Sequence, residues 1–417
     1  MKKVLLVIFV AAVAISCGGN KKIDKIQAQF KEISDAVKKE FAPDWRSKTW
    51  EAKLSVSESD GFMVLRGATT ERGAKEELLK VLGEKGLSVL DSMVVLPDPK
   101  LGGKIYGVTG SSVINFRVSP DYASESATQT IMGTPLRILE KRGGWTRAVT
   151  PEGYIAWVTS GSVREMTKEE YNRWMSSEKL VITKHYTLFR ESYLAESGVV
   201  SDGVMGGIVM SEAEVVPIRM NIGVLPGNRI VNYEVILPNG KKAFVPESDA
   251  MPYDKWIESR NPNPDNIIAT AKQFLGFPYM WGGTSIKAMD CSGFTKTVYY
   301  LNGVIIQRDA SQQALTGDDV DISSGFGNLA KGDLLFFGTK ATAERGERVT
   351  HVGIYIANGE FIHSATSVRI NSLIPTAENY YEGSTRLVRA KRVIPKVDME
   401  SGITSVKNHP WYSVITD

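Results

Sequence analysis

The chain has 417 residues, enough for about three domains, and its 50 basic and 47 acidic residues leave a formal charge of only +3. Because 42% of the residues are hydrophobic, we expect globular cores and exclude a chain that is disordered throughout. No long basic run and no interleaving of arginine with aromatic residues occurs, so we expect no nucleic-acid partner.

Residues 1–17 have the pattern of a signal peptide. Two lysines precede an apolar run over residues 4–15, which is shorter than the roughly 20 residues that cross a bilayer as a helix. The run ends at Ala14-Ile15-Ser16-Cys17, which resembles the lipobox of bacterial lipoproteins. The resemblance implies acylation of Cys17 and an exported, membrane-anchored lipoprotein of the cell envelope, in the periplasm. A plain secretory signal is the alternative.

The two cysteines of the chain, Cys17 and Cys291, differ in their expected roles. If Cys17 carries lipid, Cys291 has no partner for a disulfide. An exported protein rarely keeps an unpaired thiol in an oxidising compartment unless the thiol has a task. Cys291 is therefore a candidate reactive group, and a buried structural cysteine is the alternative.

Residues 23–98 are predicted to form a small α/β domain. Apolar residues recur at steps of three and four between Ile23 and Val37, which predicts a helix. Strands, a further helix and a last strand are predicted at residues 54–57, 62–66, 75–82 and 92–96. This order resembles the BON-type domain of exported bacterial proteins, and a generic α+β spacer is the alternative.

Two all-β domains are predicted over residues 105–178 and 180–258. Short strands recur every eight to twelve residues between Gly, Pro and Ser turns. Residues 105–178 resemble a bacterial SH3-like barrel, and residues 180–258 resemble a divergent copy of it. A helix over residues 167–177 is predicted to join them.

Residues 265–397 carry the motifs with chemical meaning. A helix is predicted to start with Asp265 as its N-cap, and the run Asp290-Cys291-Ser292-Gly293 opens another that ends near Leu301. Phe294, Val298 and Leu301 recur at helical spacing and form its predicted apolar face. Asp290 is the expected N-cap, which places Cys291 in the first turn. The free amides and dipole of a helix start favour a thiolate and can bind an oxyanion.

Two of the four histidines lie downstream of this helix. His351 opens an alternating strand, and His363 ends the next one, after a turn at Asn358-Gly359. A nucleophile on a helix start, a base on a strand and a third polar group on the next strand form the general acyl-transfer triad. A simple two-residue hairpin would separate the two histidines by about 10 Å along the strand. Contact between them requires a bulge, strong coiling or another register.

Five ordered blocks resemble the NlpC-type cell-wall peptidases, a bacterial branch of the papain-like cysteine peptidases. They are Pro278-Tyr279-Met280-Trp281-Gly282-Gly283, Asp290-Cys291-Ser292-Gly293-Phe294, Lys331-Gly332-Asp333-Leu334-Leu335-Phe336-Phe337, His351-Val352-Gly353-Ile354-Tyr355 and Phe361-Ile362-His363. The resemblance implies a papain-like α+β catalytic domain. It implies that Cys291 attacks a carbonyl, that His351 takes and returns the proton, and that His363 orients His351.

The order of domains, SH3-like barrels followed by this NlpC-type domain, resembles one subgroup of the family. These are the γ-D-glutamyl-L-diamino-acid endopeptidases, also called dipeptidyl-peptidase VI. The resemblance implies hydrolysis of the γ-D-Glu–diamino-acid bond in murein peptides that bear a free N-terminal L-Ala. It implies substrate contacts from the first barrel and the catalytic domain, at Glu125, Tyr154, Tyr279, Asp290, Ser292 and Asp309. For Glu125 and Tyr154, an exposed loop glutamate and a barrel core tyrosine are the alternatives.

The sequence thus predicts a multidomain α+β protein: a small α/β domain, two SH3-like barrels and a papain-like domain. Its predicted partners are peptidoglycan-derived peptides and, through Cys17, a membrane. No cofactor is expected, and His185 and His409 lack the neighbours of a metal site. Alternatives are an endopeptidase on intact peptidoglycan stems and a lipid-tethered wall-binding module. Residues 405–417 suggest no function.

Overall fold

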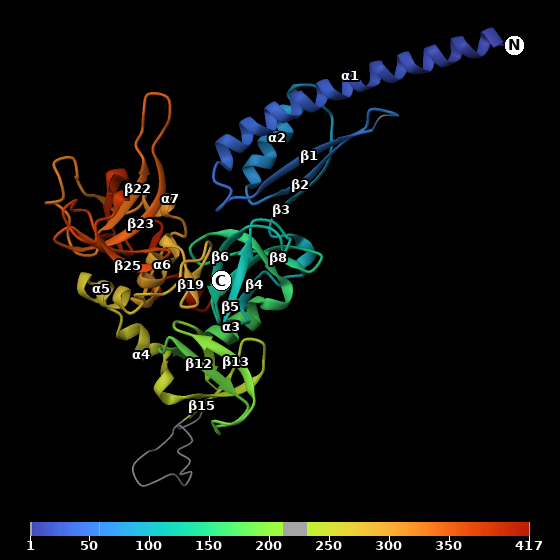
Figure 1. Cartoon of the computed structure of the whole chain (residues 1–417). Helices are drawn as coiled ribbons and strands as arrows, with labels where there is room; N and C mark the ends of the chain where they lie inside the picture. The colour runs from blue at the N-terminus through green and yellow to red at the C-terminus, as the bar shows by residue number, and fades with distance from the viewer. Residues whose placement is uncertain (1, 58, 212–231, 417) are drawn as a thin grey trace, which may run out of the picture. The chain divides into compact units, whose positions relative to one another are not determined.

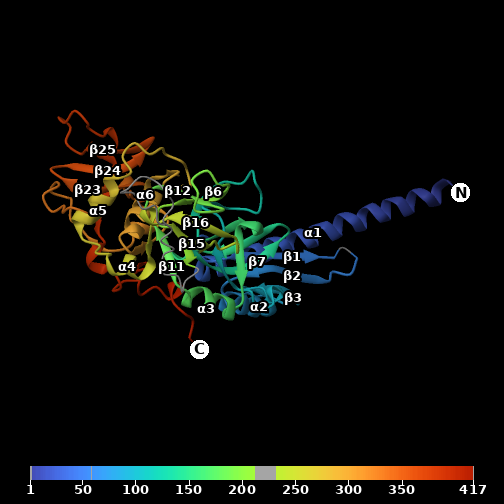
Figure 2. The same ribbon diagram turned by 90° about the horizontal axis from the view of Figure 1, so that it is seen from below.

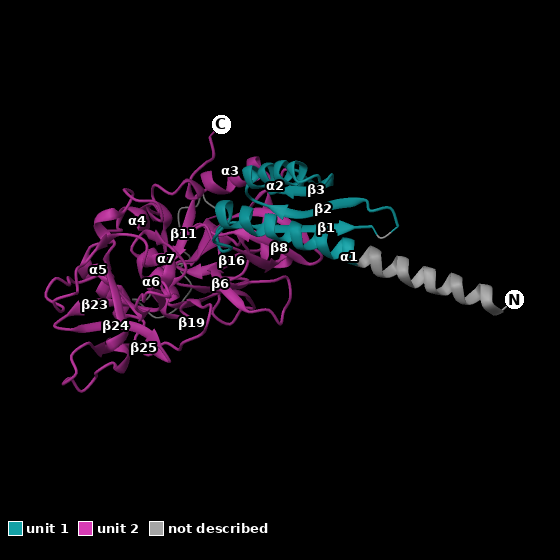
Figure 3. Ribbon diagram, turned by 90° about the horizontal axis from the view of Figure 1, so that it is seen from above, with its two compact units in different colours: residues 1–102 teal, residues 103–417 magenta. Residues whose placement is uncertain are grey.

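The computed structural model describes residues 2–57, 59–211 and 232–416, with side chains from residue 21 onward (Figure 1). It contains two compact units, Met1–Gly102 and Gly103–Asp417 (Figure 3). Cys17, the predicted lipidation site, and the predicted signal peptide fall outside the described side chains. Among the described residues, no helix is both long enough and apolar enough to cross a membrane.

The first unit has the predicted order of helix, two strands, helix and strand. Both helices extend beyond their predicted ranges, and each strand is longer than predicted but falls one residue short at one end. The elements are α1 (Lys2–Phe41), β1 (Trp50–Val56), β2 (Met63–Thr69), α2 (Arg72–Glu84) and β3 (Leu90–Val95). β2 lies between β1, which is antiparallel to it, and β3, which is parallel. Phe30 and Leu78 of the helices bury against Leu54 and Leu65 of the sheet, so both helices cover one face.

The second unit begins with two β-domains that share one strand order. The first consists of β4 (Tyr106–Thr109), β5 (Val113–Arg117), β6 (Ser126–Ile131), β7 (Pro135–Arg142), β8 (Trp145–Val149), β9 (Ile155–Thr159) and β10 (Val163–Met166). The second consists of β11 (Lys179–Ile182), β12 (Tyr186–Arg190), β13 (Val199–Val204), β14 (Ile208–Ser211), β15 (Asn232–Ile236), β16 (Lys242–Pro246) and β17 (Ala250–Pro252). The orders β10-β4-β7-β8-β9-β5-β6 and β17-β11-β14-β15-β16-β12-β13 correspond strand by strand, which confirms the prediction of a second copy.

Helices α3 (Lys168–Ser176) and α4 (Tyr253–Glu258) follow the two barrels. Thr167 and Glu170 form a capping box at the start of α3, as expected for a helix in this place. Short 3-10 helices occur at η1 (Pro99–Leu101), η2 (Ser160–Ser162), η3 (Glu247–Asp249), η4 (Glu382–Arg386), η5 (Ile394–Lys396) and η6 (Pro410–Tyr412).

The catalytic domain packs helices against a six-stranded antiparallel sheet of order β21-β26-β22-β23-β24-β25. Strands β23, β24 and β25 lie side by side (Figure 2). The elements are α5 (Pro264–Lys272), β18 (Thr284–Ser285), β19 (Ala288–Met289), α6 (Cys291–Leu301), β20 (Val304–Ile306), α7 (Ala310–Gln313), β21 (Asp318–Asp319), β22 (Leu334–Thr339), β23 (Arg348–Ala357), β24 (Glu360–Ala365), β25 (Ser367–Ser372), β26 (Leu387–Arg392) and β27 (Ile403–Ser405).

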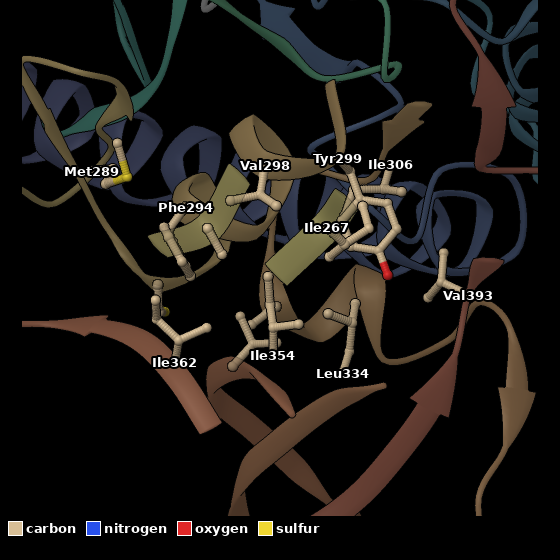
Figure 4. Packing of buried hydrophobic residues seen from close by; sticks show 14 of the residues in the cluster. Ile267, Met289, Phe294, Val298, Tyr299, Ile306, Leu334, Ile354, Ile362 and Val393 are labelled. Atoms are coloured by element: carbon tan, nitrogen blue, oxygen red, sulfur yellow. The ribbon is translucent and has the colours of Figure 1, made fainter. Parts of the chain in front are cut away.

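Helix α6 forms the centre of this domain's core. Phe294 and Val298, on its predicted apolar face, lie above Ile354 and Ile362 of the sheet (Figure 4). All four side chains are fully buried, and burial of each stabilises the fold by about 1.5–3 kcal/mol. The packing holds the first turn of α6 against β23. One sequence prediction is wrong: α5 is capped by the Asn263 side chain, with Pro264 at its first position, and not by Asp265.

Candidate active site

Cys291 is the first residue of α6 and is 8% exposed. Asp290 is its N-cap, as predicted, because the Gly293 amide donates to Oδ1 of Asp290 at 2.7 Å. A Cβ atom at position 293 would lie 1.9 Å from the carbonyl oxygen of Gly283. Glycine is therefore required at position 293 for the loop before β18 to approach the helix start.

The two histidines of the predicted triad are in direct contact. A bulge between Tyr355 and Ala357 shifts the register, so that Ile354 pairs with Ile362 and His363 falls opposite Gly353. A Cβ at Gly353 would come within 3.1 Å of Cβ of His363, so the glycine leaves room for the rings to meet diagonally. Nε2 of His351 lies 2.6 Å from Nδ1 of His363. The bulge is one of the three solutions that the sequence left open.

A third strand completes the chain of hydrogen bonds. Nε2 of His363 lies 2.8 Å from Oδ1 of Asn371 on β25, and Nδ2 of Asn371 donates to the carbonyl of Asn379. Because Oδ1 can only accept, His363 carries its proton on Nε2, and its Nδ1 accepts from Nε2 of His351. His351 is left with an unprotonated Nδ1, the atom that can act as a base.

The sulfur of Cys291 lies beside the strand that carries His351, since the backbone amide of Val352 is close enough to lower the pKa of the thiol. Burial raises the pKa of the Cys291 thiol to about 12, and the Asp290 carboxylate contributes to this rise. The amides of Val352 and Ser292 and the Arg308 guanidinium act in the opposite direction. The expected stabilisation of a thiolate by the helix start is therefore outweighed by burial, and the resting group is a neutral thiol.

Aromatic rings enclose the histidine pair. The ring centroids of Phe361 and Tyr381 lie 4.7 and 5.1 Å from that of His363, and Phe337 lies 5.7 Å from His351. Burial lowers the pKa of His351 to about 3, and repulsion by His363 adds to this. Burial also lowers the pKa of His363 to about 4, with Asn371 acting the other way. Burial thus favours the neutral forms of the thiol and of both imidazoles.

A buried ion pair joins the helix start to the segment after β20. Arg308 is 2% exposed, and its Nη2 lies 2.6 Å from Oδ2 of Asp290. Its Nη1 donates to Oγ of Ser292 and its Nε to Oγ1 of Thr128 in the first barrel, each at 2.9 Å. The predicted substrate contacts Asp290 and Ser292 are therefore brought together, and Arg308 engages both.

The first barrel lies directly against the loop that precedes Cys291. Nε1 of Trp281 donates to Oε1 of the exposed Glu125 at 2.8 Å. The amide and hydroxyl of Thr284 donate to the side chain and the carbonyl of Gln129, at 2.9 and 2.8 Å. Glu125 is thus held at the edge of the catalytic domain.

The other predicted contacts surround the same ion pair. Tyr154 is 4% exposed, and it lies close enough to Arg308 to interact with its charge. Burial, with Cys291 as the next cause, raises the pKa of Tyr279 to about 12. Oδ1 of Asp309 lies 3.8 Å from Nη1 of Arg308, and its side chain caps α7. No group of three metal-ligating side chains occurs among residues 21–57, 59–211 and 232–416.

Comparison with known proteins identifies this arrangement. Residues 276–390 match the NlpC/P60 family, and residues 116–163 match the bacterial dipeptidyl-peptidase Sh3 domain. The γ-D-glutamyl-L-lysine dipeptidyl-peptidase of Bacillus cereus is 30% identical over 254 residues, which are 61% of this chain and 71% of that protein. This chain belongs to the NlpC/P60 family. As a member of it, the protein is a cysteine peptidase.

A further relative is similar in sequence, and a solved structure is similar in fold. The γ-D-glutamyl-L-lysine dipeptidyl-peptidase of Bacillus subtilis is 36% identical over 146 residues, 35% of this chain and less than half (46%) of that relative. A crystal structure of an NlpC/P60 family protein from Bacillus cereus shares the fold, with a TM-score of 0.56 and 24% identity. The superposed region covers 70% of this chain and all of the chain in that crystal structure.

Three residues of this NlpC/P60 site did not follow from sequence reasoning. Asn371 lies on a strand after the last family motif, and only the strand pairing brings it to His363. Arg308 directly precedes the predicted contact Asp309, but its partners lie at the start of α6 and in another domain. Tyr381 comes from a loop far from both histidines in sequence. The one signal in the sequence was that Asn371 is a polar residue on the strand that follows the strand of His363.

We expect the stability of this NlpC/P60 peptidase to fall in mild acid. Unfolded histidine has a pKa of about 6.5, while burial lowers the pKa values of His351 and His363 to about 3 and about 4. Below pH 6.5 the unfolded chain therefore binds protons that the folded chain does not, and stability is lost as the pH falls. Each histidine should contribute about 1 kcal/mol of loss between about pH 7.5 and 5.5.

Urea unfolding at the two pH values measures this loss. The same loss in wild type and in a His351→Gln/His363→Gln double variant would contradict the assignment of the effect to this pair.

Proposed function

We propose that Cys291 is the nucleophile, His351 the general base and His363 a positioning residue. The sulfur attacks a peptide carbonyl carbon while its proton passes to Nδ1 of His351. The same proton is then given to the departing amine, which leaves a thioester on Cys291. Water, deprotonated by His351, hydrolyses the thioester and restores the thiol. Because thiol and imidazole are both neutral at rest, attack and proton transfer occur together.

The proposed substrate is a murein peptide with a free N-terminal L-Ala, cut at the γ-D-Glu–diamino-acid bond. The observation that carries this proposal is the Glu125 carboxylate, which the first barrel places against Trp281 at the edge of the catalytic domain. A carboxylate there pairs with an α-ammonium and leaves no partner for a blocked amine. Both Bacillus relatives bear the name γ-D-glutamyl-L-lysine dipeptidyl-peptidase, which supports the proposal.

Paired substrates test this proposal. We expect L-Ala-γ-D-Glu-diamino acid to be cleaved about 10- to 100-fold faster, by kcat/KM, than its N-acetylated form, as a lost charge-assisted hydrogen bond implies. Glu125→Gln should remove most of this preference, and Glu196→Gln, an exposed change in the second barrel, should not. Equal cleavage of both peptides by the wild type would refute selection for a free amine.

Intact peptidoglycan distinguishes the alternative enzyme. A D,L-endopeptidase of wall stems would release peptides from purified sacculi at a rate comparable with its action on free peptide. The proposed enzyme releases little from sacculi, because stem peptides carry no free L-Ala amine.

We also propose that the protein is an exported lipoprotein of the cell envelope, anchored in the periplasm through acylated Cys17. The apolar run and the Ile15-Ser16-Cys17 ending support this proposal. Cells fed an alkyne-tagged fatty acid should label the wild type and not Cys17→Ser. Equal labelling of both proteins would exclude this anchor.

A further inference from the structure

The C-terminal segment, residues 403–416, begins on the catalytic domain. Its strand β27 pairs antiparallel with β20, with Ile403 opposite Ile306, two residues before Arg308. Val406, the residue after β27, is fully buried, and its amide donates to the carbonyl of Gly303. The segment is therefore fastened beside the chain that leads into the buried ion pair.

The segment then crosses to the first barrel. Nε2 of His409 lies 3.0 Å from the carbonyl oxygen of Pro151. The side chain of Asn172 in α3 makes two hydrogen bonds to the backbone of Ile415, at 3.0 and 2.9 Å. The hydroxyl of Tyr171 donates to the carbonyl of Trp411. These bonds join the end of the chain to a domain almost 250 residues earlier in sequence.

Three aromatic rings around Arg137 also hold the C-terminal segment against the first barrel. The guanidinium of Arg137 in β7 lies 4.6 Å from the ring centroid of Trp411, and 4.7 and 4.8 Å from those of Tyr106 and Tyr171. Three aromatic faces around one cation attract it more strongly than a single face does. The C-terminal segment thus bridges the catalytic domain and the first barrel.

One of the contacts of the C-terminal segment with the barrel is at the turn before Tyr154. The turn is closed by hydrogen bonds from the amides of Thr150 and Gly153, to the carbonyls of Tyr154 and Thr150. On one side of the turn, the side chain of His409 hydrogen-bonds to the carbonyl of Pro151. Tyr154 ends the turn next to Arg308.

On its other side, an ion pair holds the turn to the catalytic helix. Oε1 of Glu152 lies 2.7 Å from Nζ of Lys296, and the two side chains are 2% and 15% exposed. Lys296 is in α6, the helix that starts with Cys291. A cavity of about 50 Å³, lined in part by Glu152, Lys296 and Tyr412, lies under the turn. If either anchor were lost, the cavity would give the turn room to shift.

We propose that His409 is a positioning residue for substrate selection: together with the Glu152–Lys296 pair, it holds the 150–154 turn. That turn places Tyr154, a predicted substrate contact of the first barrel like Glu125, beside Arg308. This inference rests on the proposed function. The C-terminal segment, which suggested no function from sequence, then sets the selectivity of a site to which it contributes no reacting group.

The hydrogen bonds of His409 define the variants that test this proposal. Nδ1 of His409 accepts from the Trp411 amide at 3.2 Å, so the ring proton is on Nε2 and is donated to Pro151. Glutamine at position 409 carries a donor nitrogen at a similar reach, whereas alanine has none. Val414, 44% exposed in the same segment, offers a matched control.

We expect His409→Ala to raise KM for the free-amine peptide about tenfold, the effect of one lost hydrogen bond, with kcat changed less than about twofold. The preference over the N-acetylated peptide should fall by a similar factor. His409→Gln should restore most of both, and Val414→Ala should match the wild type. Glu152→Gln, which weakens the other anchor, should reproduce the KM effect even if His409→Ala does not fold.

Hydrogen exchange of the full-length protein provides a readout that does not depend on the substrate. The Gly153 amide should exchange faster in His409→Ala than in wild type, and at the wild-type rate in His409→Gln. Unchanged KM and unchanged exchange in His409→Ala would overturn the proposal. So would a loss of kcat that His409→Gln fails to restore, since that is the result of general destabilisation. If the wild type does not prefer the free amine, the proposed function fails, and faster exchange at Gly153 still decides whether His409 holds the turn.

Discussion

Replacement of Cys291 by Ala is expected to lower kcat by a factor of about 10⁴ to 10⁶, to the level that binding alone supports. The sulfur is the atom that forms the thioester, and no other thiol is among the described side chains. His351→Ala should have an effect of similar size, because a thiol whose pKa burial raises to about 12 cannot attack without a base. Single-turnover assays with the free-amine peptide measure both variants.

Combining the two changes gives a sharper test. Since Cys291 and His351 act on one proton, the double variant should be little slower than either single variant. Asn371→Ala should lower kcat by only about 10- to 100-fold, because it leaves the Nε2–H of His363 without its acceptor but keeps the base. Circular dichroism and urea unfolding establish that the variants are folded. Activity of Cys291→Ala within tenfold of wild type would exclude the proposed mechanism.

Removal of the Arg308 charge is expected to produce the largest loss of stability, about 3–5 kcal/mol for Arg308→Met. The guanidinium is almost completely buried, and without it the Asp290 carboxylate stays buried with no counter-charge. The change also removes the hydrogen bond to Thr128, which joins the first barrel to the catalytic domain. Urea unfolding at about pH 7.5, above the range in which His351 and His363 affect stability, measures the difference in free energy of unfolding.

An exposed ion pair of the same length provides the control. Nζ of Lys331 lies 2.6 Å from Asp265, the distance found for Arg308 and Asp290, but the two side chains are 43% and 81% exposed. Lys331→Met should therefore lose less than about 1 kcal/mol. Asp290→Asn in the Arg308→Met background should recover part of the loss, since Asn still caps the helix. Equal losses for the two single variants would show that burial does not set the strength of this pair.

Local sequence was enough to predict elements whose residues are close in the chain. The start of α6 followed from the Asp290 cap and the spacing of Phe294, Val298 and Leu301, and the structure confirms all of it. The strand order of the second barrel was expected from its likeness to the first. The start of α5 was predicted wrongly because nearby polar residues can each cap a helix, and Pro264 decides in favour of Asn263.

Contacts between strands that are distant in sequence were harder to predict, because a shift of one residue in the strand pairing moves every side chain of a strand to the other face. A regular hairpin keeps His351 and His363 apart, and the bulge before Ala357 together with the missing side chain of Gly353 brings them to 2.6 Å. Asn371 joins them through the same pairing. No spacing of residues within a single strand contains this information.

By itself, the sequence determined the kind of chemistry, since an unpaired Cys291 at a helix start followed by two strand histidines has few other uses. Only the tertiary structure decided the charge state of that chemistry and the neighbours of the site. Burial keeps Cys291 and His351 neutral at rest, against the effect of the helix start. Arg308 and His409 acquire partners in the first barrel, because domain packing brings together residues that are far apart in the chain.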